Sequence, residues 1–396
     1  MAKKVYVGMS GGVDSSVTAA LLQKQGYDVT GVYMKNWSQD LPGMVCPWKE
    51  DYQDAKRVAV QLGIPFKMYD FETEYRHKVV EYMIEEYKAG RTPNPDIMCN
   101  QEVKFKLFLS TAFEDGADFI ATGHYARIIR SPSLQRRVLS SHPSPMVLTA
   151  FRATGVPQGS PPAASASRGL TRNRGEKCEL WAGVDTDKDQ SYFLCRVTEA
   201  ALQKSLMPIG EYKKAQVREL ARKFGLATAD KKDSQGICFV GKVGIKDFLQ
   251  QYVQPSPGKI IDQHGKVIGE HDGALFYTIG QRQGLGVGGG LPYYVVGKDM
   301  NKNEVYVTSD LQDTRLWNKE FTIASIHWIN DKPEEAGAYT VRTRYHGDLL
   351  DVNSIKELRD GNWHVALNDE VRALAPGQSA ALYQDDRVVG SGILVG

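Results

Sequence analysis

Residues 8–15, near the N-terminus, combine glycine, serine and aspartate in a way that suits phosphate binding. They follow an apolar run, 5–7, and precede a segment with helical periodicity, 17–25. A strand, a glycine-rich loop and a helix in this order direct backbone N–H groups and the start of the helix at an anion. Glycine is needed because a residue without Cβ lets the backbone approach phosphate oxygens closely. The loop lacks the spacing of Walker A and dinucleotide-binding motifs, so we expect a different kind of nucleotide loop.

Residues 90–100 form a second candidate reactive segment, in which two prolines stiffen the chain. This segment carries Asn94, Asp96 and Cys99 close together. Residues 101–114 have the pattern of a helix, which places Cys99 near a helix N-terminus, where a thiolate is stabilised. Asn-Pro-Asp also forms ordinary turns, so the pattern alone leaves both interpretations open.

Two further groups of candidate site residues lie at the ends of predicted strands. Residues 117–125 indicate a strand that ends in Gly123 and His124, and residues 27–34 indicate another that ends in Met34. The carboxyl ends of parallel strands meet at the sheet edge where ligands bind, so these side chains are expected beside the glycine-rich loop. Met34 would touch the base of a nucleotide there. A lone histidine can also be the hydrogen-bonded neighbour of a tyrosine, so the role of His124 stays open.

The five cysteines are odd in number and widely spread, which argues against a disulfide scaffold, and none falls in a Cys-x-x-Cys pair, which argues against a structural zinc site. Cys238 lies between an isoleucine and a phenylalanine, and by default such a cysteine is a small buried hydrophobe. Cys46 lies in a loop and is either functional or incidental. The residues around Cys178 and Cys195 indicate no role for them.

Composition is that of a soluble enzyme: 396 residues, 42% hydrophobic and 24% charged, with a net charge of +2. No apolar run is long enough for a membrane span, and the first residues lack the core of a signal peptide. We expect a cytoplasmic protein without membrane contact, or an organellar protein after removal of a transit peptide.

Alternating strands and helices in the first part of the chain predict an α/β fold with a doubly wound parallel sheet. Helix Lys213–Phe224 favours a small central, partly helical domain. After residue 258, short alternating strands such as 259–262 and 304–308 predict an antiparallel β-barrel. We therefore expect three domains, with bounds 1–203, 204–270 and 271–396.

Residues 130–177 differ from the rest of the chain. They contain eight lysines or arginines and a single acid, Glu176, among many prolines, glycines and serines. The rest of the chain therefore has a net charge of about −5. Such a composition does not bury enough apolar surface to fold, which predicts a flexible basic insertion. It suits contact with RNA phosphates, but an inert loop explains it equally well.

Motifs in order along nearly the whole chain resemble those of the tRNA-specific 2-thiouridylase family. This family belongs to the PP-loop ATP pyrophosphatases, whose nucleotide domain is of the adenine nucleotide alpha hydrolase type. The matching segments are 8–16, 34–37, 90–100, 121–125, 188–194, 232–241, 277–282 and 376–378.

The resemblance implies roles for single residues. ATP is bound by the loop and two strand ends: Gly8, Met9, Ser10, Gly11, Gly12, Val13, Asp14, Ser15, Met34 and Gly123. Cys238 carries a persulfide, Cys99 is the nucleophile that resolves it through a transient disulfide, and Asp96 is the acid/base. Asn94, Pro95 and Asp96 border the target base. The implied tRNA contacts are His124, Lys188, Asp189, Gln190, Arg344, Tyr345 and Gln378.

The implied activity is that of a sulfurtransferase acting on the anticodon stem-loop of tRNA. ATP, with Mg²⁺ near Asp14 and Ser15, adenylates the C2 carbonyl of the wobble uridine, because oxide itself is a poor leaving group. Sulfur from the cysteine persulfide then replaces AMP, giving 2-thiouridine, AMP and pyrophosphate. A persulfide donor or relay protein must supply the sulfur. No structural metal is expected.

Two other classes remain. A PP-loop enzyme acting on a small molecule, like argininosuccinate or NAD synthetase, would explain the glycine-rich loop but not Cys99, Cys238 and the β domain. A non-catalytic tRNA-binding protein or thiol relay would explain the scaffold but not the intact loop together with Asp96, Cys99 and Cys238.

Overall fold

The computed structural model describes residues 1–40, 46–132, 176–232, 244–288 and 290–395. The chain divides into two units, one of residues 1–129 with 178–396 and one of residues 130–177. The second unit is the predicted basic insertion, and its residues 133–175 lie outside the described residues. The described sheets and helices belong to the first unit, apart from two strand ends that border the second.

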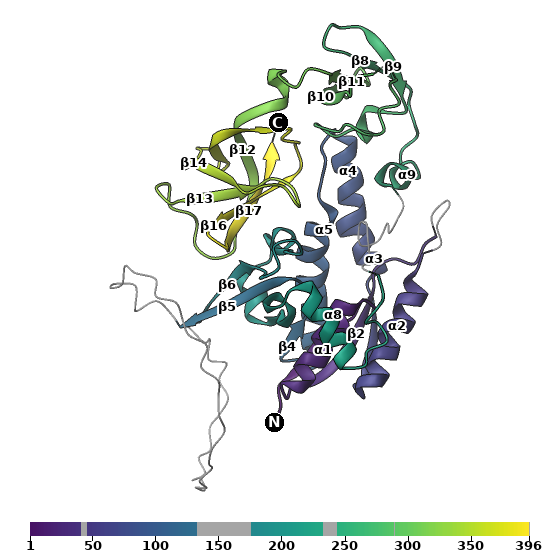
Figure 1. Ribbon diagram of the computed structural model, residues 1–396, viewed down its shortest axis with the longest axis vertical. Coiled ribbons are helices and arrows are strands. Elements are labelled where there is room, and N and C mark those ends of the chain that lie inside the picture. Colours follow the sequence, from purple (N-terminus) through teal and green to yellow (C-terminus); the bar gives the residue numbers. More distant parts are fainter. Residues whose placement is uncertain (41–45, 133–175, 233–243, 289, 396) are drawn as a thin grey trace. The chain divides into compact units, whose positions relative to one another are not determined.

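In the described part of the chain, five strands form a parallel sheet in the order β3-β2-β1-β4-β7, of which β2 and β4 are labelled in Figure 1. Their bounds are β1 Lys4–Gly8, β2 Asp28–Lys35, β3 Phe66–Asp70, β4 Phe119–Ala121 and β7 Ser205–Leu206. Every neighbouring pair is parallel. Parallel neighbours need long crossovers, and these contain the helices.

The sheet is covered on both faces, because successive side chains of a strand point to opposite sides. Val5 and Val7 of β1 belong to an apolar cluster with three helices: α1 Val13–Lys24, α2 Trp48–Leu62 and α8 Lys214–Lys223. Tyr6, between the two valines, belongs to a second cluster that contains Val79 and Phe108 from helical segments on the other face. The predicted doubly wound α/β fold is confirmed.

The second face is covered by two helical stretches. The first consists of α3 Glu72–Tyr75, the π-helical η1 Arg76–Glu81 and α4 Tyr82–Lys88. The second consists of α5 Pro95–Met98, the π-helical η2 Cys99–Leu107 and α6 Phe108–Glu114. This second stretch begins at Pro95 and not at Gln101 as the sequence pattern indicates, because proline is well tolerated in the first turn of a helix.

A hairpin and several short helices follow β4 in the chain. The hairpin strands are β5 Ala126–Pro132 and β6 Glu176–Ala182, and the helices are η3 Ser191–Leu194, α7 Glu199–Gln203, η4 Pro208–Glu211 and α9 Ile245–Leu249. Leu180 and Trp181 of β6 pair with Val388 and Arg387 of the last strand of the chain. The hairpin thus extends the C-terminal sheet.

Among the described residues, four strands form a separate sheet in the order β10-β11-β8-β9. Their bounds are β8 Gly258–Ile261, β9 Val267–His271, β10 Tyr294–Asp299 and β11 Glu304–Thr308, with η5 Ala274–Phe276 between β9 and β10. β8 and β11 pair in parallel, so these two predicted strands are real but do not belong to the antiparallel barrel. The domain boundary predicted at 270/271 falls inside β9.

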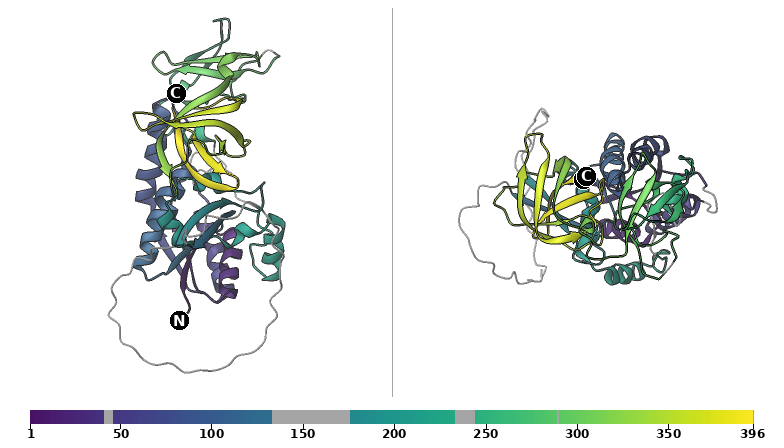
Figure 2. Two further views of the ribbon diagram at one scale, coloured as in Figure 1. Left: turned by 90° about the vertical axis from the view of Figure 1, so that its left-hand side faces the viewer. Right: turned by 90° about the horizontal axis from the view of Figure 1, so that it is seen from above.

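The last strands of the described chain form a closed antiparallel barrel, which Figure 2 shows from two sides. The strands are β12 Trp317–Trp328, β13 Tyr339–Arg342, β14 Leu350–Glu357, β15 Trp363–Arg372, β16 Ser379–Gln384 and β17 Arg387–Val395, preceded by η6 Thr314–Leu316. Pairing of β12 with β17 closes the barrel. Buried Val365, Leu382 and Leu394 belong to its core, so the predicted C-terminal barrel is confirmed.

Candidate active site

The glycine-rich loop joins β1 to α1 and is shaped by close backbone contacts. Gly11 has a φ of +75°, and a Cβ there would lie 2.4 Å from the carbonyl oxygen of Asp51 in α2. Ser15 Oγ accepts a hydrogen bond from the N–H of Ser10 at 3.2 Å, which closes the loop. Gly12 precedes α1 and offers no side-chain cap. The first N–H groups of α1 are therefore presented without a capping side chain, which is the arrangement that binds anions.

Two strand ends complete this edge of the sheet. A Cβ on Gly123, after β4, would lie 2.7 Å from the nitrogen of Ser15, so only glycine lets the strand approach the loop this closely. A Cβ on Gly8 would lie 2.9 Å from Cε of Met34, the half-buried residue near the end of β2. The structure thus brings Gly8, Met34 and Gly123 together with the loop, as the sequence predicts.

Asp14, in the first turn of α1, accepts hydrogen bonds from two residues distant in the sequence. Lys214 Nζ of α8 lies 2.8 Å from Oδ1 and 2.9 Å from Oδ2 of the carboxylate. The hydroxyl of Tyr125 donates to Oδ1 at 2.7 Å. The ammonium group also lies 5.6 Å from the ring centre of Tyr125. The acidic residue next to the glycine-rich loop therefore forms an ion pair with a lysine of α8.

The oxygen atoms of this loop fit Mg²⁺ that arrives with a nucleotide. The Asp14 side chain is 31% exposed, and Ser10 Oγ and Ser15 Oγ lie 3.4 Å apart nearby in the chain. Mg²⁺ prefers oxygen ligands and is often held by one carboxylate together with substrate phosphates. In the described part of the chain no group of three or more His, Cys, Asp or Glu side chains is suited to hold a metal by itself.

The second candidate segment begins with a capped helix. Asn94 Oδ1 accepts a hydrogen bond from the N–H of Ile97 at 3.2 Å, and Pro95 occupies the first turn. Asp96 is half-buried, whereas Cys99 is only 1% exposed. Because residues three apart lie on the same face of a helix, Asp96 and Cys99 share one side of this helical stretch.

Aromatic residues from two other elements adjoin this helix. Burial raises the pKa of Tyr192 well above its ordinary value, and a hydrogen bond with the Asn94 side chain opposes this effect. Burial also raises the pKa of Tyr345, and the negative charge of Asp96 contributes to this increase. Phe193 and Tyr345 pack with ring centres 4.3 Å apart. Aromatic surface suited to stacking a base therefore lies next to Asn94 and Asp96.

A chain of contacts connects the two candidate segments. Phe105, on the helix that continues from Cys99, packs against His124 with ring centres 5.8 Å apart. His124 follows Gly123, which touches the glycine-rich loop at Ser15. The helical stretch that begins at the capped segment therefore reaches the strand end beside the glycine-rich loop.

Cys238 lies outside the described residues, which resume at 244. The chain before it is fixed at Lys231, whose Nζ lies 2.8 Å from Oδ1 of Asp51 and 2.7 Å from Oδ2 of Asp54. The carbonyl of Asp51 is the group that contacts Gly11 of the phosphate loop. The last described residues before Cys238 thus lie close to the glycine-rich loop, and the pairing of Cys238 with Cys99 stays a prediction.

Thr92 connects the second candidate segment to both β domains. Its N–H donates to the carbonyl of Pro376 at 2.8 Å, and its carbonyl accepts from Gln378 Nε2 at 2.9 Å. Its hydroxyl lies 3.1 Å from the hydroxyl of Thr278. The C-terminal barrel and the central domain therefore hold the residue two positions before Asn94.

Protein family models match most of the chain in three consecutive parts. Residues 3–147 and 163–242 match the tRNA methyl transferase HUP domain, 246–309 the tRNA methyl transferase PRC-barrel domain, and 318–394 the aminomethyltransferase beta-barrel domain. The chain is 42% identical to the tRNA-specific 2-thiouridylases MnmA of Bacillus subtilis and Idiomarina loihiensis, covering 99% of this chain and 94% and 96% of theirs. The chain belongs to the tRNA-specific 2-thiouridylase family. Among solved structures, a predicted subunit of tRNA methyltransferase from Methanocaldococcus jannaschii matches 35% of this chain and 59% of its own at 21% identity, with a TM-score of 0.23.

The tRNA contacts implied by the 2-thiouridylase family differ in exposure in this structure, and Gln190, Tyr345 and Gln378 are half-buried. Lys188 and Arg344 are exposed. His124 and Asp189 are buried, at 8% and 5% exposure. Burial lowers the pKa of His124 well below its ordinary value, and its Nδ1 lies 2.8 Å from Thr122 Oγ1. All of these stay predicted tRNA contacts.

Asp189 and Gln190 are both engaged within the protein. Asp189 accepts hydrogen bonds from the N–H and hydroxyl of Ser191, and its Oδ2 lies 3.2 Å from Nη1 of Arg342. Gln190 exchanges two hydrogen bonds with the backbone of Tyr125, one from its own N–H and one to its side-chain oxygen. These contacts join the site to the barrel and to the residue that binds Asp14.

Sequence reasoning missed Lys214 and Thr92. Lys214 lies in a segment whose pattern indicates only an amphipathic helix, and nothing local relates it to Asp14. Thr92 stands within the predicted reactive segment, but its partners come from residues 278 and 376–378. No local signal identifies either residue.

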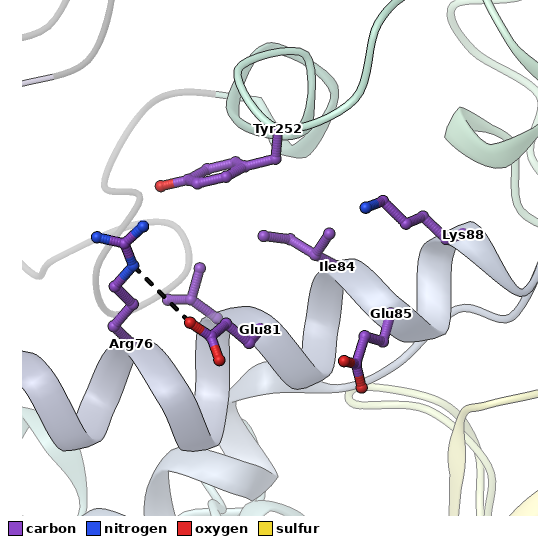
Figure 3. A pocket seen from close by; sticks show the side chains of 7 residues that line it. Arg76, Glu81, Ile84, Glu85, Lys88 and Tyr252 are labelled. Atoms are coloured by element: carbon purple, nitrogen blue, oxygen red, sulfur yellow. Dashed lines mark ion pairs between the residues drawn. The ribbon is translucent and has the colours of Figure 1, made fainter.

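A surface pocket of about 280 Å³ lies apart from these residues, between the helical stretch of η1 and α4 and Tyr252 (Figure 3). The residues of this helical stretch that line it are Arg76, Val80, Glu81, Ile84, Glu85 and Lys88. None of the predicted site residues lines this pocket. In the described part of the chain no helix is long and apolar enough to cross a membrane.

Proposed function

We propose that this chain is a tRNA 2-thiouridylase that uses ATP to activate the C2 carbonyl of the anticodon wobble uridine and replaces its oxygen by sulfur. The observation that carries the proposal is that the helical stretch beginning at the capped segment Asn94–Cys99 contacts, through Phe105, the strand end beside the phosphate-type loop. Membership of the 2-thiouridylase family supports the choice of substrate.

ATP is the proposed source of activation. The N–H groups at the start of α1 hold its phosphates, with Asp14 and Ser15 as ligands for Mg²⁺. Met34 and Gly123 border the nucleotide at the strand ends. The carbonyl oxygen of the uridine attacks the α-phosphate and pyrophosphate leaves, so that the oxygen becomes part of AMP, a good leaving group.

The target uridine is proposed to leave its base stack, as bases that undergo chemistry must. Asn94, Pro95 and Asp96 border it, and the Phe193–Tyr345 pair supplies stacking surface. Asp96 acts as the acid/base. tRNA phosphates would be contacted by exposed cations such as Lys188 and Arg344.

Sulfur transfer is proposed to use two thiols. A donor or relay protein loads Cys238 as a persulfide, whose outer sulfur attacks C2 and displaces AMP. The Cys99 thiolate then attacks the inner sulfur, so that a Cys99–Cys238 disulfide forms and the outer sulfur stays on the uridine. A reductant of the dithiol class must reduce this disulfide before the next cycle.

The proposal is tested by incubating the protein with MgATP, tRNA and a persulfide donor, and digesting the tRNA for nucleoside mass spectrometry. We expect 2-thiouridine at the wobble position and an equal amount of AMP, both absent when ATP is left out. AMP production without thiolated tRNA would favour a small-molecule PP-loop enzyme. Binding of tRNA with neither product would favour a non-catalytic protein.

A further inference from the structure

We propose that Lys214 is a phosphate-binding residue of the nucleotide site, which rests on Asp14 in the nucleotide-free protein and moves onto the β- and γ-phosphates when MgATP binds. This inference rests on the proposed use of ATP and adds a residue that no motif of the chain indicates. The chemical class of its ligand is a polyphosphate, meaning ATP before the reaction and pyrophosphate after it.

The position of the ion pair is the first argument. Lys214 Nζ contacts both oxygens of Asp14, and Asp14 is the second residue of α1, directly after the glycines of the loop. The ammonium group therefore lies at the helix N-terminus, where bound phosphates are expected. An ion pair that only joined α1 to α8 would serve equally well anywhere along the two helices.

The packing of α8 is the second argument. Val217 and Ala221 of α8 are fully buried in the same apolar cluster as Val17 and Leu22 of α1. Burial of these side chains already holds the two helices together. The contact between Lys214 and Asp14 is thus not needed to attach α8.

Electrostatics is the third argument. A carboxylate at a phosphate site repels its substrate unless a cation accompanies it, and in the nucleotide-free protein Lys214 is such a cation. When Mg²⁺ arrives with ATP it takes the carboxylate, since Mg²⁺ requires oxygen ligands. The ammonium group is then available to the phosphates, whose charge exceeds what one Mg²⁺ neutralises.

The attachment of the side chain permits this exchange. The backbone N–H of Lys214 donates to Oδ2 of Asp185 at 2.7 Å, which fixes where α8 begins. The four-carbon stem of lysine carries a compact charge with freely rotating donors, so Nζ moves while the backbone stays in place. Lys214 is 13% exposed, so the charge remains within the site.

The test measures nucleotide affinity by calorimetry for the full chain and for Lys214→Met. We expect the variant to lose about 10- to 100-fold in affinity for MgATP, the range for a charge-assisted hydrogen bond, and less than about threefold for AMP. The matched control is Lys223→Met, the same change at an exposed position of the same helix, which should alter neither affinity.

The contrast between ATP and AMP decides between phosphate binding and structure. Equal loss for both nucleotides would show that Lys214 only shapes the loop, and no loss for either would show that it does not take part; each result overturns the inference. If Lys214→Met does not fold, Lys214→Gln, which keeps a donor for Asp14, should give the same ATP-selective loss. Failure of the wild-type chain to bind MgATP would instead contradict the proposed function.

Discussion

Gln378 Nε2 of the C-terminal barrel donates a hydrogen bond to the carbonyl of Thr92, at 2.9 Å, two residues before the helix cap Asn94. Gln378 is one of the predicted tRNA contacts, so the same side chain that is expected to meet tRNA also holds the segment with Asp96 and Cys99. A Cβ on Gly377 would lie 2.8 Å from the nitrogen of Thr92, so only glycine lets this turn reach the segment. We therefore predict that tRNA bound at Gln378 influences the position of the helical segment that carries Asp96 and Cys99.

Removal of the hydrogen bond between Gln378 and Thr92 should slow thiolation without changing the affinity for ATP. We expect Gln378→Ala to lower kcat about 5- to 10-fold, as loss of one hydrogen bond of about 1 kcal/mol would, because Asn94 and Asp96 lose their alignment. Single-turnover thiolation rates at saturating ATP and tRNA measure this. Gln312→Ala, at an exposed turn, is the control. An unchanged rate in Gln378→Ala would contradict the predicted coupling between the barrel and the helix.

The helix cap should be worth measurable stability. Asn94→Ala removes the acceptor for the N–H of Ile97, and we expect it to lower the free energy of unfolding by about 1 kcal/mol. Asn94→Asp keeps an acceptor and should retain most of that stability. Urea denaturation compares the two variants, and equal loss in both would mean that the loss does not come from the cap hydrogen bond.

Substitutions at the neighbouring residues Lys188 and Asp189 should affect different properties, tRNA binding for Lys188 and stability for Asp189. Asp189→Ala leaves the largely buried Arg342 without this carboxylate, and we expect a loss of about 3–5 kcal/mol in unfolding free energy. Lys188→Ala, at an exposed position, should leave stability unchanged but weaken tRNA binding and reduce the slope of log affinity against log salt by about 1. A salt slope equal to the wild-type value would remove Lys188 from the predicted interface.

Stability should depend on pH through Lys298. Burial lowers the pKa of this lysine to about 8, and its Nζ donates to the carbonyl of Tyr277. In the unfolded chain the pKa of a lysine is about 10.4. Between about pH 8 and pH 10.4 the lysine is therefore protonated in the unfolded chain but mostly neutral in the folded chain. The free energy of unfolding consequently rises with pH across this window.

Lys298→Met lacks this titration. Its unfolding free energy relative to wild type should therefore be highest below pH 8 and fall by about 2–3 kcal/mol as the pH approaches 10. Denaturation of both proteins at several pH values measures the difference, with the exposed Lys319→Met as control. Parallel curves for Lys298→Met and wild type would show that Lys298 is not perturbed.

Sequence patterns predict the parts of this fold that local physics determines. Val5 and Val7 alternate with Tyr6 in a strand buried on both sides, and the glycines after them permit little except a tight phosphate-type loop. The carboxyl-edge rule for parallel strands places Met34 and Gly123 beside that loop. These features are predictable because neighbours in the chain cause them.

The features that sequence patterns miss arise from contacts between distant residues. Lys214 reaches Asp14 across 200 positions, and Thr92 meets Gln378 across 286. The parallel pairing of β8 with β11 separates the central sheet from the barrel, although each strand by itself has the pattern of a barrel strand. No local pattern records such pairings, because they depend on how whole domains pack.

The two-thiol mechanism is best tested through the disulfide that sulfur transfer should leave behind. Wild-type protein loaded with persulfide is mixed with MgATP and a limiting amount of tRNA, without reductant, and the cysteines are mapped by mass spectrometry. We predict one Cys99–Cys238 disulfide for each 2-thiouridine formed, no thiolation in Cys99→Ser, and both products in Cys46→Ser. Wild-type rates of 2-thiouridine formation in Cys99→Ser would contradict the mechanism.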